Sequence, residues 1–164
     1  GHAGEVAHVP IGDLALKCPT CNNNGCVEAE LRVSGLVNSV PHLRELPGGA
    51  SHKWGLFVEY LNSPAGQALA QEKAVLLGKL GSILVNIFDP EVLYIGGHIA
   101  DVYDLMEERF INEIELRCPL ATAREMKIVV DANSAFTRYK GISETIYEKW
   151  VPLADRFAGE RVDS

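Results

Sequence analysis

The sequence predicts an α/β fold, in which helices pack on the faces of a parallel sheet. Two short apolar runs, residues 92–95 and 126–130, are typical of buried parallel strands, and the first is bounded by Pro90 and by a Gly-Gly pair. Longer segments, in which apolar residues recur every three or four positions, predict helices around these runs. The order of strand, helix and strand therefore indicates a sheet that is covered by helices.

The amino-terminal part of the chain is expected to form short elements joined by loops. Residues 5–11 are predicted to be strand-like and to lead into a loop that contains three cysteines. The Asn-Asn-Asn-Gly run at 22–25 predicts a turn, because asparagine and glycine tolerate the left-handed backbone conformation. Further along, we expect a helix over 26–40, a loop with prolines and glycines over 41–53 and a short helix over 54–61.

The clearest predicted element is a helix over residues 65–88. Ser63 is a suitable N-cap, Pro64 suits the first helical turn, and an Asp-Pro pair ends the segment. We expect Gly78 and Gly81 to let another element approach closely. The predicted stripe of this helix consists of Leu69, Lys73 or Leu76, Leu77, Leu80, Ile83, Leu84, Ile87 and Phe88, and it is apolar except at Lys73.

Two further helices are predicted after the first strand, over residues 99–117 and 139–150. The second of these is expected to close the fold. The first has a clear apolar side, and its predicted inner face consists of Val102, Leu105, Met106, Phe110, Ile111 and Ile114.

Composition restricts the classes of function. The 164 residues are sufficient for one domain or a large part of one, and the net charge of −7 argues against binding of a nucleic-acid backbone by this segment. The sequence contains neither a run of about 20 apolar residues nor an opening signal peptide, so we expect no membrane span. Four cysteines without an even, repeated framework indicate a reducing compartment, and a cytoplasmic location is expected.

Three cysteines and a histidine occur in one short stretch, as His8, Cys18, Cys21 and Cys26. A borderline-soft ion such as zinc prefers four nitrogen and sulfur ligands in a tetrahedral arrangement, and this spacing supplies them within one loop. The alternative is a disulfide between two of the cysteines, with the histidine an ordinary surface residue, but that pairing leaves one thiol over. Cys118 is remote in the sequence, and we expect it to be a buried free thiol.

These motifs resemble the signature of the ROK family (repressor, open reading frame, kinase). Gly-Glu-Val-Ala-His at 4–8, the cysteine run at 18–28, Val-Asn-Ile-Phe-Asp-Pro-Glu at 85–91 and Leu-Tyr-Ile-Gly-Gly at 93–97 follow one another in the family's order. The family's usual pattern is Gly-Glu-x-Gly-His and then Cys-x-Cys-Gly-x-x-Gly-Cys-x-Glu. The resemblance implies the actin-like, ribonuclease-H-like ATPase fold, of which residues 1–164 would be the carboxyl-terminal lobe.

Within that lobe, the resemblance implies a zinc-binding loop over residues 8–28 and a core of helices and sheet over about 65–150. The amino-terminal lobe would lie outside this chain. The chain opens on a dense motif instead of a methionine, which also predicts a fragment, although Gly1 and His2 could be the remnant of a tag.

The resemblance also implies roles for particular residues. The positions that match the ligands of a structural zinc ion are His8, Cys18, Cys21 and Cys26. Those that match residues hydrogen-bonded to sugar hydroxyls are Glu5, His8 and Glu28, and those that match the ATP-lining segment of the kinases are Gly96 and Gly97. Without the resemblance, the two glutamates would be a solvated strand-end residue and a partner of the helix dipole, and the glycines a tight turn.

The chain departs from the family's pattern at several positions. Ala7 replaces a glycine before the ligand histidine, and Asn22 stands where a glycine usually follows the second cysteine, which is itself spaced one residue wider. His98 replaces the third glycine of the kinases, and the run of small residues usual late in the family is missing near 141–143. A two-residue cysteine spacing is common in zinc sites, so we expect zinc binding to persist.

Three functions are compatible with these observations. The favoured one is a sugar-sensing, zinc-containing effector and dimerisation domain of a ROK-type transcriptional regulator, which would contact DNA only through an upstream domain. His98 favours it, because a regulator needs no ATP. The expected partners are a small sugar or amino sugar and a second copy of the chain.

The second function is the carboxyl-terminal half of an ATP-dependent sugar kinase, similar to a glucokinase or an N-acylhexosamine kinase. ATP would be a cofactor only in this case, and the fragment would be inactive because the catalytic aspartate and the phosphate-binding turn lie upstream. Asp13, Asp89 and Asp101 match no catalytic motif. The third function is a zinc-stabilised packing module with a decayed sugar site, which the retention of Glu5 and Glu28 argues against.

Overall fold

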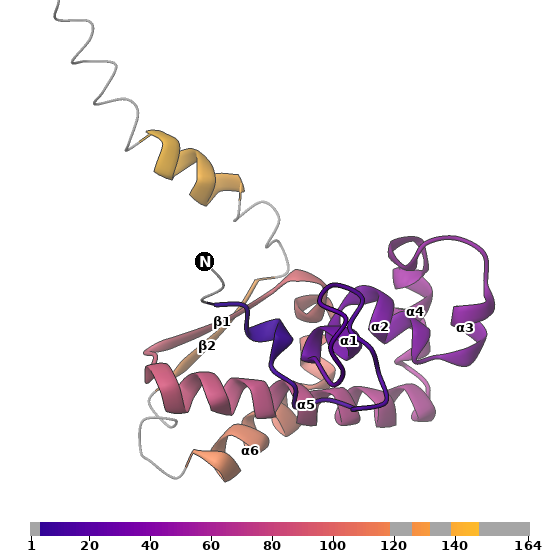
Figure 1. Cartoon of the computed structure of the whole chain (residues 1–164), viewed down its shortest axis with the longest axis horizontal. Helices are drawn as coiled ribbons and strands as arrows, with labels where there is room; N and C mark the ends of the chain where they lie inside the picture. The colour runs from indigo at the N-terminus through magenta and orange to yellow at the C-terminus, as the bar shows by residue number, and fades with distance from the viewer. Residues whose placement is uncertain (1–3, 119–125, 132–138, 148–164) are drawn as a thin grey trace, which may run out of the picture.

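The computed structural model describes residues 4–118, 126–131 and 139–147, and within them the protein is mixed α/β and rich in helix (Figure 1). Strand β1 (Val92–Gly96) pairs in parallel with β2 (Lys127–Asp131), so that Val92 lies opposite Lys127 and Gly96 opposite Asp131. Both predicted strands are confirmed to within one residue, and so is their parallel pairing.

The two strands are less buried than their apolar sequences predicted. Ile95 is buried, whereas the side chains of Val92, Tyr94, Val129 and Val130 are exposed. Neighbouring side chains of a strand point to opposite faces, so Val92, Tyr94 and Val129 lie on the face opposite to that of Ile95. Val130 shares the face of Ile95 and is exposed as well. The prediction that both faces of the sheet are buried is therefore wrong for the described part of the chain.

The long helix α5 (Pro64–Phe88) confirms the prediction for residues 65–88. The Oγ atom of Ser63 accepts a hydrogen bond from the backbone N–H of Gly66 at 3.0 Å, and Pro64 occupies the first turn, as the sequence predicted. The helix ends at Asp89, whose φ of 45° is left-handed and whose N–H bonds to the carbonyl of Val85.

Helix α6 (Glu107–Arg117) packs closely against α5, and glycine makes this approach feasible. A Cβ on Gly78 would overlap the Cβ of Glu113, and one on Gly81 would lie 2.9 Å from the Cδ1 of Ile114. The face of α5 that contacts α6 therefore carries the small residues Gly78 and Gly81. The end of the predicted apolar stripe is wrong, because Ile87 and Phe88 are 67% and 66% exposed.

The helix predicted over 99–117 consists of two elements. The 3₁₀ helix η3 (Gly97–Leu105) is followed by α6, and Met106 separates them. Four residues of the predicted inner face are nevertheless buried: Val102, Met106, Phe110 and Ile114. Both helix types place residues three or four apart on one side, so the pattern survives the change of helix type.

The elements near the amino terminus differ more from the prediction. The strand expected over 5–11 is wrong, because Val6–His8 forms a 3₁₀ turn, η1. The helix expected over 26–40 is divided into α1 (Val27–Leu31) and α2 (Val33–Asn38) by Arg32, whose ψ of 157° is extended. A Cβ on Gly35 would overlap the carbonyl oxygen of Ala29, so glycine permits this sharp bend.

The loop expected over 41–53 contains two helical turns, α3 (Pro41–Glu45) and η2 (Ala50–Lys53). Pro41 stands at the start of α3, where its missing N–H costs nothing. Helix α4 (Trp54–Tyr60) confirms the short helix expected over 54–61.

Two hydrophobic clusters hold these elements together. One joins α2, α3 and α4 to α5 and η3, and its buried members are Leu36, Val37, Val40, Leu43, Phe57, Leu61, Ala70, Ala74, Val102 and Met106. The other joins α5, β1, η3 and α6, and its buried members are Val85, Ile95, Tyr103, Phe110, Ile114 and Cys118. Burial confirms Cys118 as a free thiol inside the protein, with its Sγ 3.5 Å from the carbonyl oxygen of Ser82.

The last helix is described in part. Residues 139–147 are helical and exposed, whereas 148–150 of the predicted element lie outside the described residues. In the parts of the chain that the structure describes, no helix has both the length and the apolar character that crossing a membrane requires.

Candidate metal centre

The three neighbouring cysteines are brought together by a tight loop. The backbone N–H of Cys18 bonds to the carbonyl of Asn23 at 2.8 Å, and that of Asn22 bonds to the carbonyl of Cys18 at 3.0 Å. Asn22 and Gly25 have φ angles of 63° and 77°, so both adopt the left-handed conformation that the turn residues predicted. Asn22 therefore supplies the backbone geometry of the glycine that it replaces.

His8 reaches this loop from a different element. It ends the η1 turn, and the following Val9 accepts a hydrogen bond at its carbonyl from the N–H of Val27, at 3.2 Å. This bond holds the η1 segment against the start of α1, next to Cys26. Ala7 has a negative φ, so the replacement of the family's glycine introduces no left-handed strain at this point.

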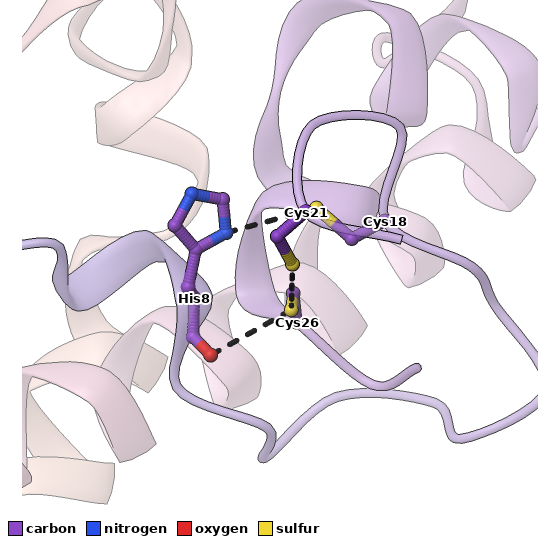
Figure 2. Close-up of side chains that lie close together, drawn as sticks. All are labelled: His8, Cys18, Cys21 and Cys26. Atoms are coloured by element: carbon purple, nitrogen blue, oxygen red, sulfur yellow. Dashed lines mark hydrogen bonds between the residues drawn. The ribbon is translucent and has the colours of Figure 1, made fainter. Parts of the chain in front are cut away.

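The four ligand atoms converge on one point (Figure 2). All four donor atoms of His8, Cys18, Cys21 and Cys26 lie within 4.8 Å of one another. The Sγ atoms of Cys21 and Cys26 are 3.4 Å apart, and the Nδ1 of His8 lies 3.7 Å from the Sγ of Cys18. A tetrahedral zinc ion with Zn–S bonds of about 2.3 Å needs ligand atoms about 3.8 Å apart, so the set fits such an ion closely.

All four cysteines of the chain are free, so the predicted disulfide alternative is not what the structure contains. The Sγ atoms of Cys18 and Cys26 are enclosed, because these residues are 0% and 1% exposed. Three enclosed or half-enclosed thiols and an imidazole form a donor set for a metal ion such as zinc.

The protein environment acts on the two most closely spaced thiols in opposite directions. The backbone N–H of Asn23 lowers the pKa of Cys21, and burial opposes this shift. Burial, and after it the neighbouring Cys21 and Cys18, raise the pKa of Cys26 to about 12. A metal ion that binds here must therefore displace the proton of Cys26 at neutral pH.

Glu28 lies beside the metal-ligating cluster, in the first turn of α1. One of its carboxylate oxygens is 3.5 Å from the Nδ1 of His8 and 3.6 Å from the Sγ of Cys18. The other accepts a hydrogen bond from the Oγ1 of Thr20 at 2.8 Å and lies 3.5 Å from a guanidinium nitrogen of Arg32. The His8 ring turns its second nitrogen away from the sulfur atoms (Figure 2).

The structure brings two of the three predicted sugar-binding residues into contact. His8 and Glu28 meet at the edge of the cluster, and Glu5 lies at the start of the η1 turn that His8 ends. The carbonyl of Glu5 accepts the N–H of His8 at 3.1 Å, and Glu5 itself is exposed.

The glycine pair predicted to approach a nucleotide lies at the end of β1, on a different part of the fold. Gly97 has a φ of 75°, and a Cβ built on it would meet nothing within 4 Å. The left-handed backbone thus accounts for this glycine, in agreement with the tight-turn explanation. The ring of His98 packs edge-on against Trp54 at 5.0 Å, so this departure from the family's pattern has a packing role.

Sequence reasoning missed two features of this region. Thr20, between the first two cysteines, orients Glu28 through its hydroxyl group. Glu30 is buried and pairs with Lys73 of α5 at 2.8 Å, while its other carboxylate oxygen accepts the N–H of Asp13 at 2.7 Å. The available signal was a lysine at an apolar position of the predicted helix.

The described part of the chain is thus a mixed α/β domain with an enclosed Cys₃His cluster that could hold a metal ion and a carboxylate beside it. The model of the ROK family matches residues 1–136, and the chain belongs to this family. Membership implies the actin-like ATPase fold.

A solved structure supports the same fold. It is described as a ROK family transcriptional regulator, a homologue of the E. coli Mlc protein, and it is 22% identical to this chain with a TM-score of 0.62. The match covers 79% of this chain and 34% of that chain, so the present sequence spans about a third of the regulator's length.

Proposed function

We propose that this chain is the zinc-stabilised, sugar-sensing and dimerising part of a ROK-type transcriptional regulator. The observation that carries the proposal is the position of His8, which directs Nδ1 toward the cysteine cluster and lies 3.5 Å from the carboxylate of Glu28. One residue thus belongs both to the metal-ligating set and to the set that would bind sugar.

Zinc is the metal that this donor set supports best. Three thiolates and one imidazole form a closed tetrahedral site of the structural type, with no ligand position left for a reacting water. His8, Cys18, Cys21 and Cys26 would hold the ion. Its contribution would be to fix the loop and the orientation of the His8 ring, because a metal bound at one ring nitrogen determines which nitrogen remains for a ligand.

A sugar would be recognised by carboxylate and imidazole groups beside this ion. Carboxylate oxygens suit sugar hydroxyls, since each oxygen accepts a hydrogen bond from a hydroxyl donor. Glu28 is half-buried, is oriented by Thr20 and lies at the edge of the cluster. The outward nitrogen of His8 and the exposed carboxylate of Glu5 would complete the set.

Two observations favour a regulator over a kinase. The solved relative is described as a transcriptional regulator, and His98, where kinases have a third glycine, is committed to packing against Trp54. In such a regulator, DNA would be bound by a domain outside these residues, and a second copy of the chain would complete a dimer. The sugar would act by shifting the population between two states of the whole protein.

The alternative is the carboxyl-terminal half of a sugar kinase. The exposed Gly97 turn at the carboxyl end of β1 favours it, because such ends of parallel strands are where nucleotides approach an α/β sheet. Incubation of the full-length protein with a panel of hexoses and ATP decides between the two. Sugar-dependent formation of ADP would establish the kinase, whereas sugar binding without turnover supports the regulator.

The sugar site is tested by calorimetric titration of the full-length protein with hexoses and N-acylhexosamines. We expect Glu28→Gln to weaken binding by about 10-fold or more, because it removes one charge-assisted hydrogen bond, while the zinc content stays at one ion per chain. Glu45→Gln, which changes an exposed carboxylate on α3, is the matched control and should bind normally. Equal affinity of the two variants would remove Glu28 from the site.

A further inference from the structure

We propose that a cavity beside the cysteine loop binds a small ligand that carries an oxyanion, either a phosphate monoester or a carboxylate. The cavity has a volume of about 360 Å³ and lies between residues 16–19 of the loop, α1, α2, α3 and α5. This volume lies in the range of small-molecule sites. The residues that resemble sugar-binding positions are not among those that line it.

Basic side chains dominate the charge of this cavity. The residues that line it include Lys17, Arg32, Arg44 and Lys73, and among the described lining residues the one acidic residue is Glu30. This concentration of positive charge stands out in a chain whose net charge is −7. Field lines focus in a cavity that is lined by one sign of charge, which draws in ligands of the opposite sign.

The Glu30 carboxylate offsets the charge of one of these cations, Lys73, and is fully engaged in doing so. One oxygen pairs with the Nζ of Lys73 at 2.8 Å, and the other accepts the backbone N–H of Asp13 at 2.7 Å. Lys73 in turn contacts Glu72 at 2.9 Å. Lys73 at the base of the cavity therefore has two carboxylate partners, and the cationic residues left for a ligand are Lys17, Arg32 and Arg44.

The cations at the rim are the groups that would meet a ligand. Lys17 and Arg44 are exposed, and neither takes part in an ion pair within the described parts of the chain. Arg32 keeps one contact of 3.5 Å with Glu28. A guanidinium group presents paired N–H donors that match the geometry of phosphate and carboxylate groups, so Arg32 and Arg44 favour an oxyanion over a neutral ligand.

Neutral polar groups complete the site. Ser34 and Asn38 of α2 line the cavity and offer a hydroxyl and an amide. Gly35 lies between them and also lines the cavity, with the backbone of α1 packed against it. The carbon skeleton of a ligand would pack against Leu16, Pro19 and Ala29, which also line the cavity. These features suit a small organic anion.

The cavity adjoins the proposed sugar site through one residue. Arg32 lines the cavity, and its guanidinium group lies 3.5 Å from Glu28, which is half-buried beside His8. An anion that binds Arg32 competes with Glu28 for it. The anion site nevertheless stands on its own residues and does not require that the chain binds sugar.

Titration of the zinc-loaded full-length protein with inorganic phosphate, glycerol phosphate and malonate tests the proposal. In the double variant Lys17→Gln/Arg44→Gln we expect the dissociation constant of the anion that binds to rise by about 10-fold or more. The control is Lys127→Gln/Lys140→Gln, which removes the same charge at exposed positions away from the cavity and should change binding by less than about 2-fold. Zinc content and melting temperature confirm that both variants are folded.

The three anions separate the sources of the oxyanion. Saturable binding of the phosphates alone would assign a phosphate ligand, and binding of malonate as well would extend the class to carboxylates. An equal loss of anion affinity in both double variants would overturn the proposal, because the loss would then follow from the change in net charge and not from the cavity. The absence of saturation with all three anions up to about 10 mM would also overturn it.

Discussion

The Nζ of Lys73 lies 2.8 Å from a carboxylate oxygen of Glu30, although 43 positions separate the two residues in the chain. Both side chains are buried, and the second oxygen of Glu30 holds the backbone N–H of Asp13. The pair thus fixes the loop that follows the η1 turn and helix α1 onto α5. A buried charge is costly unless it is paired, so this contact determines how the metal-binding loop is seated.

Removal of one partner from this pair should destabilise the protein strongly. We expect Lys73→Met to lower the free energy of unfolding by about 3–5 kcal/mol, because the Glu30 carboxylate is left buried without its counter-charge. The double variant Glu30→Gln/Lys73→Met should recover part of this loss. Glu72→Gln, which removes the exposed partner of Lys73, should cost about 1 kcal/mol or less.

Urea denaturation of the four proteins at neutral pH measures these differences. If Lys73→Met were no less stable than Glu72→Gln, the buried pair would have no special role.

The same pair should govern stability at high pH. Burial lowers the pKa of Lys73, but the hydrogen bonds and charges of Glu30 and Glu72 outweigh it, so the pKa is raised above the ordinary value of 10.5. A base whose pKa is higher in the folded protein contributes stability below its unfolded pKa and loses that contribution as the pH rises through the folded value.

The difference in melting temperature between the wild type and Lys73→Met should therefore be constant from pH 7 to about 10 and shrink above about 10.5. Thermal denaturation at a series of pH values measures it. A difference that disappears well below pH 10 would contradict the raised pKa.

The cysteine cluster predicts different effects for two buried thiols. Cys26→Ser should release the metal and lower the melting temperature, since the free energy of metal binding is also free energy of folding. Cys118→Ser is the matched control, because Cys118 is equally a buried free thiol but lies in the cluster around Ile95 and Phe110. It should keep one metal ion per chain even if it is less stable.

Elemental analysis and thermal denaturation of both variants provide the measurements. Full metal content in Cys26→Ser would refute the assignment of the four ligands.

Gly97 offers a test of backbone conformation at the end of β1. Its φ of 75° is left-handed, so we expect Gly97→Ala to cost about 1–2 kcal/mol although space for a Cβ is available. Gly55, in α4, also has space for a Cβ but no positive φ, and Gly55→Ala should stabilise the protein by about 0.5–1 kcal/mol. Chemical denaturation gives the change in the free energy of unfolding for both variants. If both changes had the same sign, the left-handed backbone at Gly97 would not be the cause of the difference.

Local chemistry made several parts of this protein predictable. The Ser63 cap, the helical period of α5 and the Asp-Pro pair after it fixed that helix within one residue, because caps and periodicity act over one or two turns. The turn at Asn22 and Gly25 and the spacing of the cysteines likewise predicted the loop that brings the thiols together. These residues lie close together in the sequence, so local geometry was enough.

Neighbouring elements decided what the sequence could not. The strand expected at residues 5–11 is a 3₁₀ turn, and Arg32 divides the helix expected at 26–40. A short apolar segment is compatible with several conformations, and tertiary packing selects among them. The bend at Arg32 depends on the absence of a side chain at Gly35, which matters only because another turn of backbone lies against it.

The sequence by itself determined the long helix, the paired strands, the grouping of His8 with three cysteines and the family. Only the tertiary structure decided that Glu28 lies beside His8, that Lys73 pairs with Glu30 and that His98 packs on Trp54. The physical reason is the range of the interactions. Caps, turns and periodicity are encoded by adjacent residues, whereas a buried ion pair or a ring contact forms between residues that only the completed fold brings together.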